Sequence, residues 1–267
     1  MFFSIIQSSH AFDTAEDNPF GLTNYAFASY LGTGFYTTSG QNVFVLQLPF
    51  NYQIIEKTDT TAGWRLNLPV TIGFINFSNI EEIEGLPNLK DVATLTFLPG
   101  IEYQYPVTRN WTLIPFADYG FARDLSYTNN ILITGAGIRS YYNFFASGER
   151  FTLGNRFLYA REKSGSTSND SDYSLIETGL NYRITSDYAF SGKPFYTNVY
   201  YINMYYPNNL VFLERTPNPI RVGMEHEVGV TFSNIPSFLF FNDVELGIGV
   251  RFGNEVEVLR IIFGAPF

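Results

Sequence analysis

The chain has 267 residues, enough for one large domain or two small ones; 18% of them are aromatic and only 15% are charged. It contains no cysteine, which excludes disulfides, thiolate nucleophiles and cysteine-bound metals. The net charge is −9, and without a cluster of Lys and Arg this balance argues against binding to nucleic acid. No uninterrupted apolar run reaches about 18 residues, so an ordinary membrane-spanning helix is also excluded.

The first residues predict a targeting segment. An apolar patch is followed by Ser9-His10-Ala11, and small residues at the first and last of these positions suit cleavage after Ala11 by a signal peptidase. The charged start and most of the apolar core of a signal peptide are missing, so we interpret residues 1–11 as a truncated signal peptide. An N-terminal segment with no targeting role is the alternative. Residues 12–21 would then form a short periplasmic segment before the first strand.

From residue 22 onward, apolar residues recur at every second position rather than with a helical period. Such alternation is typical of a strand with one apolar face. Several runs reach about 11 residues, longer than most globular strands and long enough to cross a bilayer at a tilt. No helix of useful length is expected. The predicted strands are 22–36, 42–55, 64–74, 91–105, 111–123, 131–145, 151–162, 173–185, 194–205, 221–233, 243–253 and 255–267.

We therefore predict one domain over residues 22–267, with an all-β fold. The expected architecture is a transmembrane, antiparallel, up-and-down β-barrel of about 12 strands, in which the last strand pairs with the first. A soluble β-sandwich also gives alternation, with its apolar face buried in a core. It would need neither strands of this length nor a polar face rich in glycine and charge.

The connections between the predicted strands alternate in length. If the chain enters the first strand from the periplasm, the outer connections include residues 78–90 and 163–171, and the inner ones include 106–110 and 146–150. Transmembrane barrels have longer outer loops and short inner turns. The short first connection at 37–41 is an exception. The alternation favours an even number of strands.

Amphipathic aromatic residues gather at the inner ends of the predicted strands. Trp64 and Trp111 begin strands that rise from the inner side, and Tyr103 and Tyr105 end a strand that descends to it. Such rings are enriched at membrane–water interfaces. We interpret these four residues as part of an aromatic girdle, in preference to the filling of a soluble core.

The polar faces of the predicted strands would line the lumen and carry charges of both signs. Because isolated charges in a narrow lumen would be costly, we expect them to be paired. Two interpretations stay open: a salt-bridged interior that holds the barrel in shape, and a polar conduit whose charges select solutes. The residues are Arg65, Glu102, Asp118, Arg139, Arg156, Glu177, Arg183, Glu225, Glu227, Glu245, Arg251 and Arg260.

Candidates for enzymatic chemistry are few. His10 lies in the predicted signal peptide, and His226 is expected on the outward, apolar face of its strand. A phospholipase barrel would place a serine nucleophile two residues from that histidine, and here the position is Val228. Glu225 and Glu227 share the lumen face and are expected to be structural charges near arginines. No metal-ligand spacing or phosphate loop occurs, so neither a cofactor nor enzymatic activity is predicted.

The final stretch, LRIIFGAPF, resembles the C-terminal assembly signal of bacterial outer-membrane proteins. In that signal the last residue is Phe and apolar residues alternate before it. Leu259, Ile261, Phe263 and Phe267 fit this pattern, whereas Pro266 departs from it. The resemblance implies that Phe267 is recognised by the barrel-assembly machinery. The apolar side of the last strand, including Phe267, is expected to face lipid.

In strand number, length and C-terminus, residues 22–267 are similar to the translocator barrels of autotransporters. They resemble most the solitary outer-membrane autotransporter barrels that lack a passenger. This implies an integral protein of the bacterial outer membrane, in contact with lipid and lipopolysaccharide, with a structural or pore-type role in the cell envelope. With about ten residues between the predicted cleavage site and the first strand, neither a passenger nor a pore-spanning helix is expected.

Other functions stay open beside this one. The barrel resembles small solute channels in strand number, so a porin-like channel is the first alternative. An outer-membrane hydrolase is the second, and an adhesion or receptor role through the acidic connection at 78–90 is the third. The oligomeric state is also open, with a monomer favoured.

Overall fold

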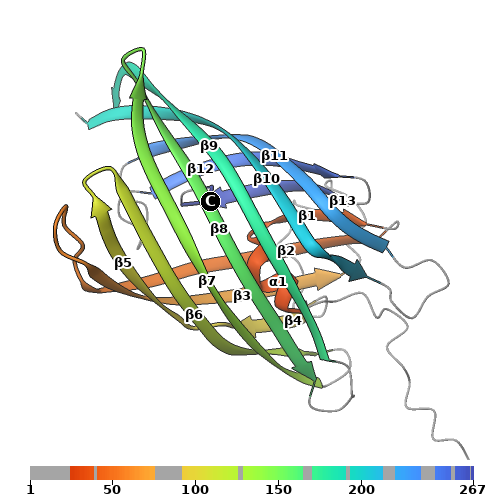
Figure 1. The fold of residues 1–267 in the computed structure, drawn as a ribbon. Helices are drawn as coiled ribbons and strands as arrows, with labels where there is room; N and C mark the ends of the chain where they lie inside the picture. Colours follow the sequence, from red (N-terminus) through yellow and green to blue (C-terminus); the bar gives the residue numbers. More distant parts are fainter. Residues whose placement is uncertain are drawn as a thin grey trace, which may run out of the picture.

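In the computed structural model, the chain forms one closed antiparallel β-barrel with a short helix inside it (Figure 1). The predicted signal peptide, the segment 12–21 and the connection 78–90 lie outside the described residues. The structure describes residues 25–38, 41–75, 92–125, 129–164, 170–190, 193–212, 220–235, 244–253, 256–264 and 266–267.

Consecutive strands pair in antiparallel fashion, and β1 pairs with β13 to close the ring. Both β4 and β5 lie between β3 and β6, so they share one strand position. The ring thus has the twelve positions that the sequence predicts, and the fold class is confirmed. The elements are α1 (Tyr25–Leu31), β1 (Gly34–Thr38), β2 (Gln41–Ile55), β3 (Gly63–Ile75), β4 (Val92–Phe97), β5 (Gly100–Thr108), β6 (Trp111–Asp124), β7 (Asn129–Ala146), β8 (Glu149–Ser164), β9 (Asp170–Phe190), β10 (Lys193–Phe212), β11 (Ile220–Ile235), β12 (Val244–Gly253) and β13 (Val256–Phe263).

The register of the strand pairs shows that the strands are tilted. Paired residues followed from Gly34 through β2, β3, β4 and β6 lead to Asn129 of β7. Followed the other way, through β13, β12, β11, β10, β9 and β8, they lead to Asn143. The two end points lie 14 residues apart on β7, so the ring closes only if its strands tilt relative to the barrel axis.

The prediction of a first strand at 22–36 is wrong over most of residues 25–36, the part that the structure describes. Residues Tyr25–Leu31 form α1, and β1 begins only at Gly34. Phe27 and Leu31 are four residues apart, which places them on one side of the helix, where both are buried. Gly32 has a φ of 84°, the left-handed conformation that commonly ends a helix. A seven-residue helix thus forms where the sequence predicted a strand and no helix of useful length.

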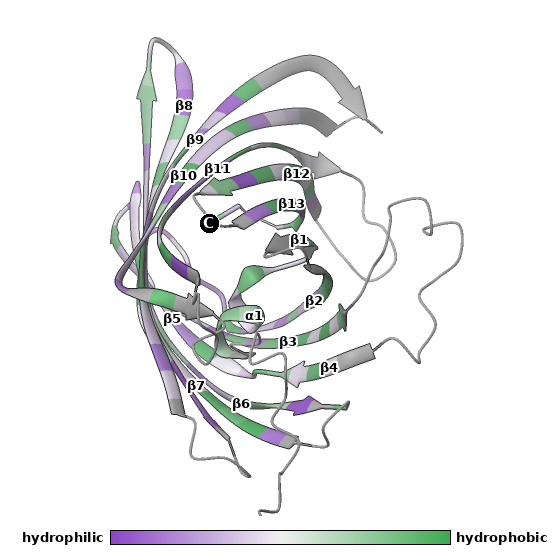
Figure 2. Ribbon diagram, turned by 90° about the vertical axis from the view of Figure 1, so that its right-hand side faces the viewer, coloured by the Kyte–Doolittle hydropathy of each residue, from purple (hydrophilic) through white to green (hydrophobic). Residues whose placement is uncertain are grey.

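Apolar side chains cover the outside of the barrel, and charged ones lie inside. Along β5, for example, Ile101 is 43% exposed whereas the next residue, Glu102, is fully buried. Apolar and polar residues alternate along many of the strands in Figure 2, which also shows α1 within the ring. A β-sandwich would bury its apolar face, so this arrangement excludes that alternative. Exposed apolar residues on the outer face include Phe50, Leu95, Phe121, Ile138, Phe157, Ile176, Val199, Val228, Ile248 and Leu259.

Aromatic rings line the outer face at the end of the barrel that carries the short turns. The rings of Trp64 and Tyr103 lie 4.8 Å apart between centroids, and Tyr103 stacks on Tyr105 at 6.2 Å. Trp111 lies on the same face and donates its indole N–H to the Ser140 hydroxyl over 2.9 Å. A stacked row that the sequence did not predict continues along β7, β8 and β9 through Tyr142, Phe144, Phe151 and Tyr182.

Gly120 lies on β6, opposite the short break between β4 and β5. A Cβ atom at this position would lie 2.1 Å from the carbonyl oxygen of Phe97, a backbone atom that cannot rotate away. We expect Gly120→Val to lower the free energy of unfolding by about 1–3 kcal/mol, measured by urea unfolding of the refolded barrel. Ala136→Val adds the same kind of side chain on the exposed outer face of β7 and should change stability by less than about 0.5 kcal/mol. Equal stabilities of the two variants would contradict the close approach of Gly120 to the Phe97 carbonyl oxygen.

Candidate functional site

The lumen of the barrel is the candidate site, and α1 occupies its part near the long connections. The backbone N–H of Ala26 donates to Glu162 Oε2 over 2.8 Å, and Glu162 lies two residues before the end of β8. Further along the helix, the Tyr30 hydroxyl donates to Asp118 Oδ2 over 2.7 Å. Because β8 ends where the predicted connection 163–171 begins, α1 starts near the long-connection end and runs inward, and Gly32 lies beside Arg260.

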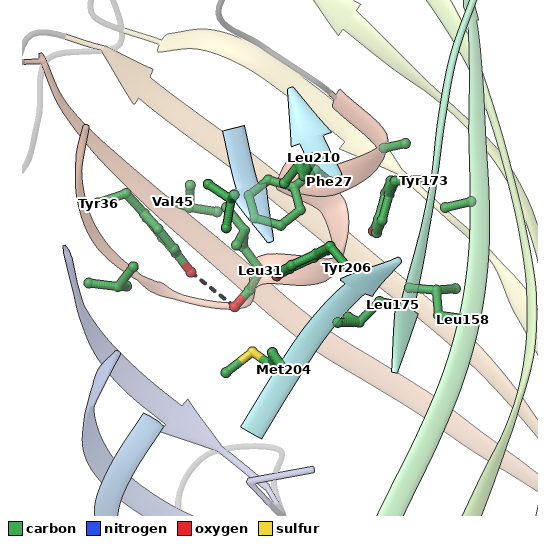
Figure 3. Close-up of a cluster of buried hydrophobic side chains, with 14 of the residues drawn as sticks. Phe27, Leu31, Tyr36, Val45, Leu158, Tyr173, Leu175, Met204, Tyr206 and Leu210 are labelled. Carbon is green, nitrogen blue, oxygen red and sulfur yellow. Dashed lines mark hydrogen bonds between the residues drawn. The ribbon is translucent and has the colours of Figure 1, made fainter. Parts of the chain in front are cut away.

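An apolar cluster inside the lumen holds this helix (Figure 3). The ring of Phe27 packs edge-on against Tyr173 at 5.8 Å and against Tyr206 at 6.1 Å, centroid to centroid. The sequence-based prediction treated these inward faces as polar. The signal that it missed is a local loss of alternation, because residues 157–160 of β8 (FLYA) and 204–206 of β10 (MYY) are apolar on both faces. The other labelled members are Leu31, Tyr36, Val45, Leu158, Leu175, Met204 and Leu210.

Glu227 is the centre of the largest ion-pair group. Its side chain is fully buried and accepts hydrogen bonds from Arg251 Nε at 3.0 Å, from Arg260 Nη1 at 2.8 Å and from the Tyr200 hydroxyl at 2.8 Å. These bonds join β10, β11, β12 and β13 across the lumen side of the sheet. Glu225, two residues away, is also fully buried and accepts a hydrogen bond from the hydroxyl of Tyr206 over 2.8 Å.

A second group forms around Glu102, nearer the short-turn end. This carboxylate is fully buried and lies 2.5 Å from Arg65 Nη2 and 2.5 Å from Arg139 Nη2. Asn67 donates a further hydrogen bond to it. The guanidinium of Arg139 also lies over the ring of Phe116, 4.7 Å from its centroid. Two positive charges thus share one carboxylate, as the pairing predicted from the sequence requires.

The remaining predicted charges form smaller groups on the same inner face. Arg156 binds Glu177 through two contacts, of 2.5 and 2.8 Å. Arg183 and Glu245 do not pair directly: Arg183 Nε donates to Asn198 Oδ1 over 3.1 Å, and Asn198 Nδ2 donates to Glu245 Oε1 over 3.2 Å. The structure therefore places all the charged residues named from the sequence inside the barrel. It joins them in separate groups rather than in one continuous line.

Phe267 does not lie on the outer face, in contrast to the expectation for the apolar side of the last strand. Leu259 and Phe263 are exposed on that face, but β13 ends at Phe263, and Gly264 has a φ of 99°. The Phe267 ring instead lies inside the barrel, stacked on Tyr141 at 6.2 Å between centroids. The Tyr141 hydroxyl donates to the Phe267 carbonyl oxygen over 2.7 Å.

Two glycines leave the space that the Phe267 ring occupies. Gly154 of β8 pairs with Tyr141 of β7 on one side and with Gly179 of β9 on the other. A Cβ atom added at Gly154 would lie 2.0 Å from the Phe267 ring, and one at Gly179 would lie 2.8 Å from it. We call this arrangement of Tyr141, Gly154 and Gly179 the ring seat. It was not foreseen from the sequence, because glycines on a lumen face have several structural explanations.

His226 lies on the outer face, as the alternation predicts. The Tyr201 hydroxyl is 2.8 Å from its Nδ1, and Asn203 Nδ2 is 3.3 Å from the same atom. Its ring lies 5.7 Å from that of Phe252, centroid to centroid. None of these three contacts supplies the serine that a lipid hydrolase of the expected kind would use.

Among the residues that the structure describes, no three His, Asp or Glu side chains gather in a way that would hold a metal ion. Within the same ranges, no helix is both long and apolar enough to span a membrane.

No protein-family model and no curated protein matches the sequence. Among solved structures, the chain is similar to the beta domain of the Bordetella autotransporter BrkA, with 8% identity and a TM-score of 0.42 over 85% of this chain and 91% of that one. This is a distant likeness to a protein of the kind that the sequence resembles. The description of the barrel depends instead on the chain's own strand pairing.

Removing the charge of Glu227 should destabilise the barrel, because Arg251 and Arg260 would be left buried without their shared partner. We expect Glu227→Gln to lower the free energy of unfolding by about 3–5 kcal/mol, measured by urea unfolding of refolded protein. Glu257 lies exposed on the outer side of the ring, so Glu257→Gln is the matched control and should cost less than about 0.5 kcal/mol. A comparable loss in both variants would refute a special role for Glu227.

The ring seat can be tested by a double-mutant cycle. Gly154→Val fills the space of the ring and Phe267→Ala removes the ring, and each should cost about 1–3 kcal/mol in urea unfolding. Because both changes destroy the same contact, the double variant should lose little more than the worse single variant. Fully additive losses would show that the ring does not occupy this seat in the folded protein.

Proposed function

We propose that this chain is an integral β-barrel of the bacterial outer membrane, of the autotransporter translocator type, whose lumen is closed by its own residues. One observation carries the proposal: a closed ring of strands exposes apolar side chains all round, while fully buried carboxylates and their arginine partners lie inside. In water this arrangement would leave the apolar face unburied. In a bilayer it covers that face with lipid and leaves no strand edge unpaired.

The distribution of aromatic rings supports a membrane location. The rings around Trp64, Trp111 and Tyr142 lie on the outer face near the short turns, where a girdle would meet the headgroups on the periplasmic side. We therefore propose lipid and lipopolysaccharide as the surroundings of the barrel. Insertion by the barrel-assembly machinery, with Leu259, Ile261, Phe263 and Phe267 as its signal, is part of the proposal by resemblance.

The position of α1 supports the translocator type among outer-membrane barrels. The helix lies in the lumen and leads within two residues into β1, so the chain passes through the interior before it joins the wall. A helix in the pore is usual in the autotransporter barrels that the sequence resembles, although the short N-terminal segment predicted none here. We propose the solitary form, without a passenger and without enzymatic activity, in which the barrel has a structural role in the envelope.

A solute channel is the alternative, and the contents of the lumen argue against it in this conformation. Two structures lie in the lumen at different depths: α1 with its apolar cluster, and the Phe267 ring on the opposite wall from β13. The charges that would select solutes are bound to one another or to neighbouring polar side chains. A closed barrel fits these contacts better than a steadily open one.

Single-barrel recordings in planar bilayers test the closed lumen. The wild-type barrel should conduct rarely, whereas the double variant Phe27→Ala, Tyr30→Phe should raise the open time at least tenfold. These changes weaken the contacts of α1 with Tyr173, Tyr206 and Asp118 and leave the barrel wall unaltered. Ala28→Ser, at a half-buried position of the same helix, is the control and should behave as wild type.

Steady conductance by the wild-type barrel would favour the channel. The location is tested separately, by fractionating membranes of the producing cell. Recovery of the folded, heat-modifiable barrel outside the outer-membrane fraction would overturn the proposal as a whole.

A further inference from the structure

One row of outward side chains crosses five neighbouring strands and is entirely polar. The strand register aligns one residue from each of β7, β8, β9, β10 and β11, and apolar Leu113 and Phe252 continue the row at its two ends. Each member lies on the face that carries the exposed apolar residues. We call it the polar row, and it consists of Ser140, Asn155, Thr178, Asn203 and His226.

The rows on both sides of the polar row are apolar or aromatic. Two residues along each strand in one direction, the register aligns Phe157 with Ile176, and Met224 lies further along the same row. In the other direction it aligns Leu180 with Tyr201. Four of these five side chains are between 41% and 47% exposed, and Met224 is 49% exposed. The polar row is therefore a single polar stripe on an apolar surface.

Hydrogen bonds within the polar row use only part of its capacity. The Thr178 hydroxyl donates to Asn155 Oδ1 over 3.1 Å, and Asn203 Nδ2 lies 3.3 Å from His226 Nδ1. A side-chain amide has two N–H donors and a carbonyl acceptor, and each of these bonds uses one of them. The amides of Asn155 and Asn203 can therefore bind further groups outside the barrel.

This row is costly if the barrel is in a membrane, so the inference rests on the proposed function. The hydrocarbon region contains no water to bind the amides, and an unsatisfied polar group there costs free energy. Polar residues in a membrane usually face another protein surface or a cavity rather than lipid. Something with hydrogen-bonding groups is therefore expected to cover the row.

The order of residues along the row identifies a partner that fits. Thr178 is at the centre, with an asparagine one strand away on each side, Asn155 on β8 and Asn203 on β10. A two-fold axis that passes beside Thr178, parallel to the barrel axis, would bring two Thr178 side chains together. Because the strands are tilted, the polar row is inclined to that axis, so the rows of the two copies would cross at Thr178, with Asn155 and Asn203 of both copies placed around the crossing. Because an amide both donates and accepts, such a patch is complementary to itself, as a two-fold interface requires.

We propose that a second copy of this chain docks on the polar row, so that the barrel forms a two-fold dimer within the membrane. The asparagines and threonines of the two copies satisfy one another at the centre of the contact. Ile176 and Leu180, above and below Thr178, pack around them and exclude lipid. The proposed dimer differs from the monomer that the sequence favoured, and its contact surface would be set by β8, β9 and β10.

Cysteine cross-linking tests the axis directly, because the natural chain contains no cysteine. Thr178→Cys should form a disulfide-linked dimer when outer membranes containing the full chain are treated with a mild oxidant. The matched control is Phe50→Cys, which is also exposed on the outer face but lies on β2, six strand positions from β9 in either direction. We expect at least ten times less cross-linked dimer from the control, measured by non-reducing gel electrophoresis.

A second variant tests the contacts themselves. In the Thr178→Cys chain, replacing Asn155 and Asn203 with leucine should reduce the cross-linked dimer at least tenfold while the barrel stays inserted and heat-modifiable. Leucine suits lipid, so this variant is expected to fold. Unchanged cross-linking after the replacement would overturn the role of the two amides.

The outcomes separate this inference from the function on which it rests. If the Thr178→Cys barrel is inserted but forms no dimer, or links only to a protein of another mass, the two-fold dimer is overturned and the outer-membrane barrel is left intact. A wild-type chain that does not reach the outer membrane overturns both.

Discussion

The pairing of β1 with β13 is the constraint on which the rest of this structure depends. It converts a twisted sheet with two open edges into a ring in which every strand has a neighbour on both sides. The pairing is short, since β1 has only five residues, and beyond it Thr33 continues the seam. The Thr33 carbonyl accepts the N–H of Ile261, and its hydroxyl both donates to the Gln47 carbonyl and accepts the Gln47 N–H. Just before β1 begins, Thr33 thus joins β13 to β2 through its own hydrogen bonds.

Closure of the ring decides how the interior is filled. The inner face of the wall is apolar around Tyr173 and Tyr206, where Phe27 of α1 packs against it. It is charged in the parts of the lumen that only side chains fill. Buried charges are tolerable because each carboxylate at the centre of a group, Glu102 or Glu227, has two arginines, one from an adjacent strand and one from a strand two positions away. The ion pairs therefore tie strands together through the lumen, in addition to the backbone hydrogen bonds of the sheet.

Alternation predicted the barrel well because the ring needs only that outward residues be apolar, a property of single positions such as Ile101 or Phe157. The same logic placed Glu102 and Glu227 inside. It failed at Tyr25–Leu31, where seven residues are too few to separate period two from a helical period. It also failed at Phe267, because the turn at Gly264 and the ring seat formed by three strands are not visible in a linear pattern. The polar row was hidden for a similar reason: Asn155, Thr178 and Asn203 are ordinary residues when taken singly, and only the register of three strands aligns them.

The two blocks in the lumen differ in their dependence on the wall. α1 is held at its start by Glu162 and further along by Asp118, so its position depends on polar contacts from two separated strands, β8 and β6. Phe267 depends on a seat built from three adjacent strands in register, β7, β8 and β9. The outer surfaces of two of these strands, β8 and β9, carry the centre of the polar row. A contact on the outside of β8 and β9 would therefore stiffen the same strands that hold the Phe267 ring on the inside.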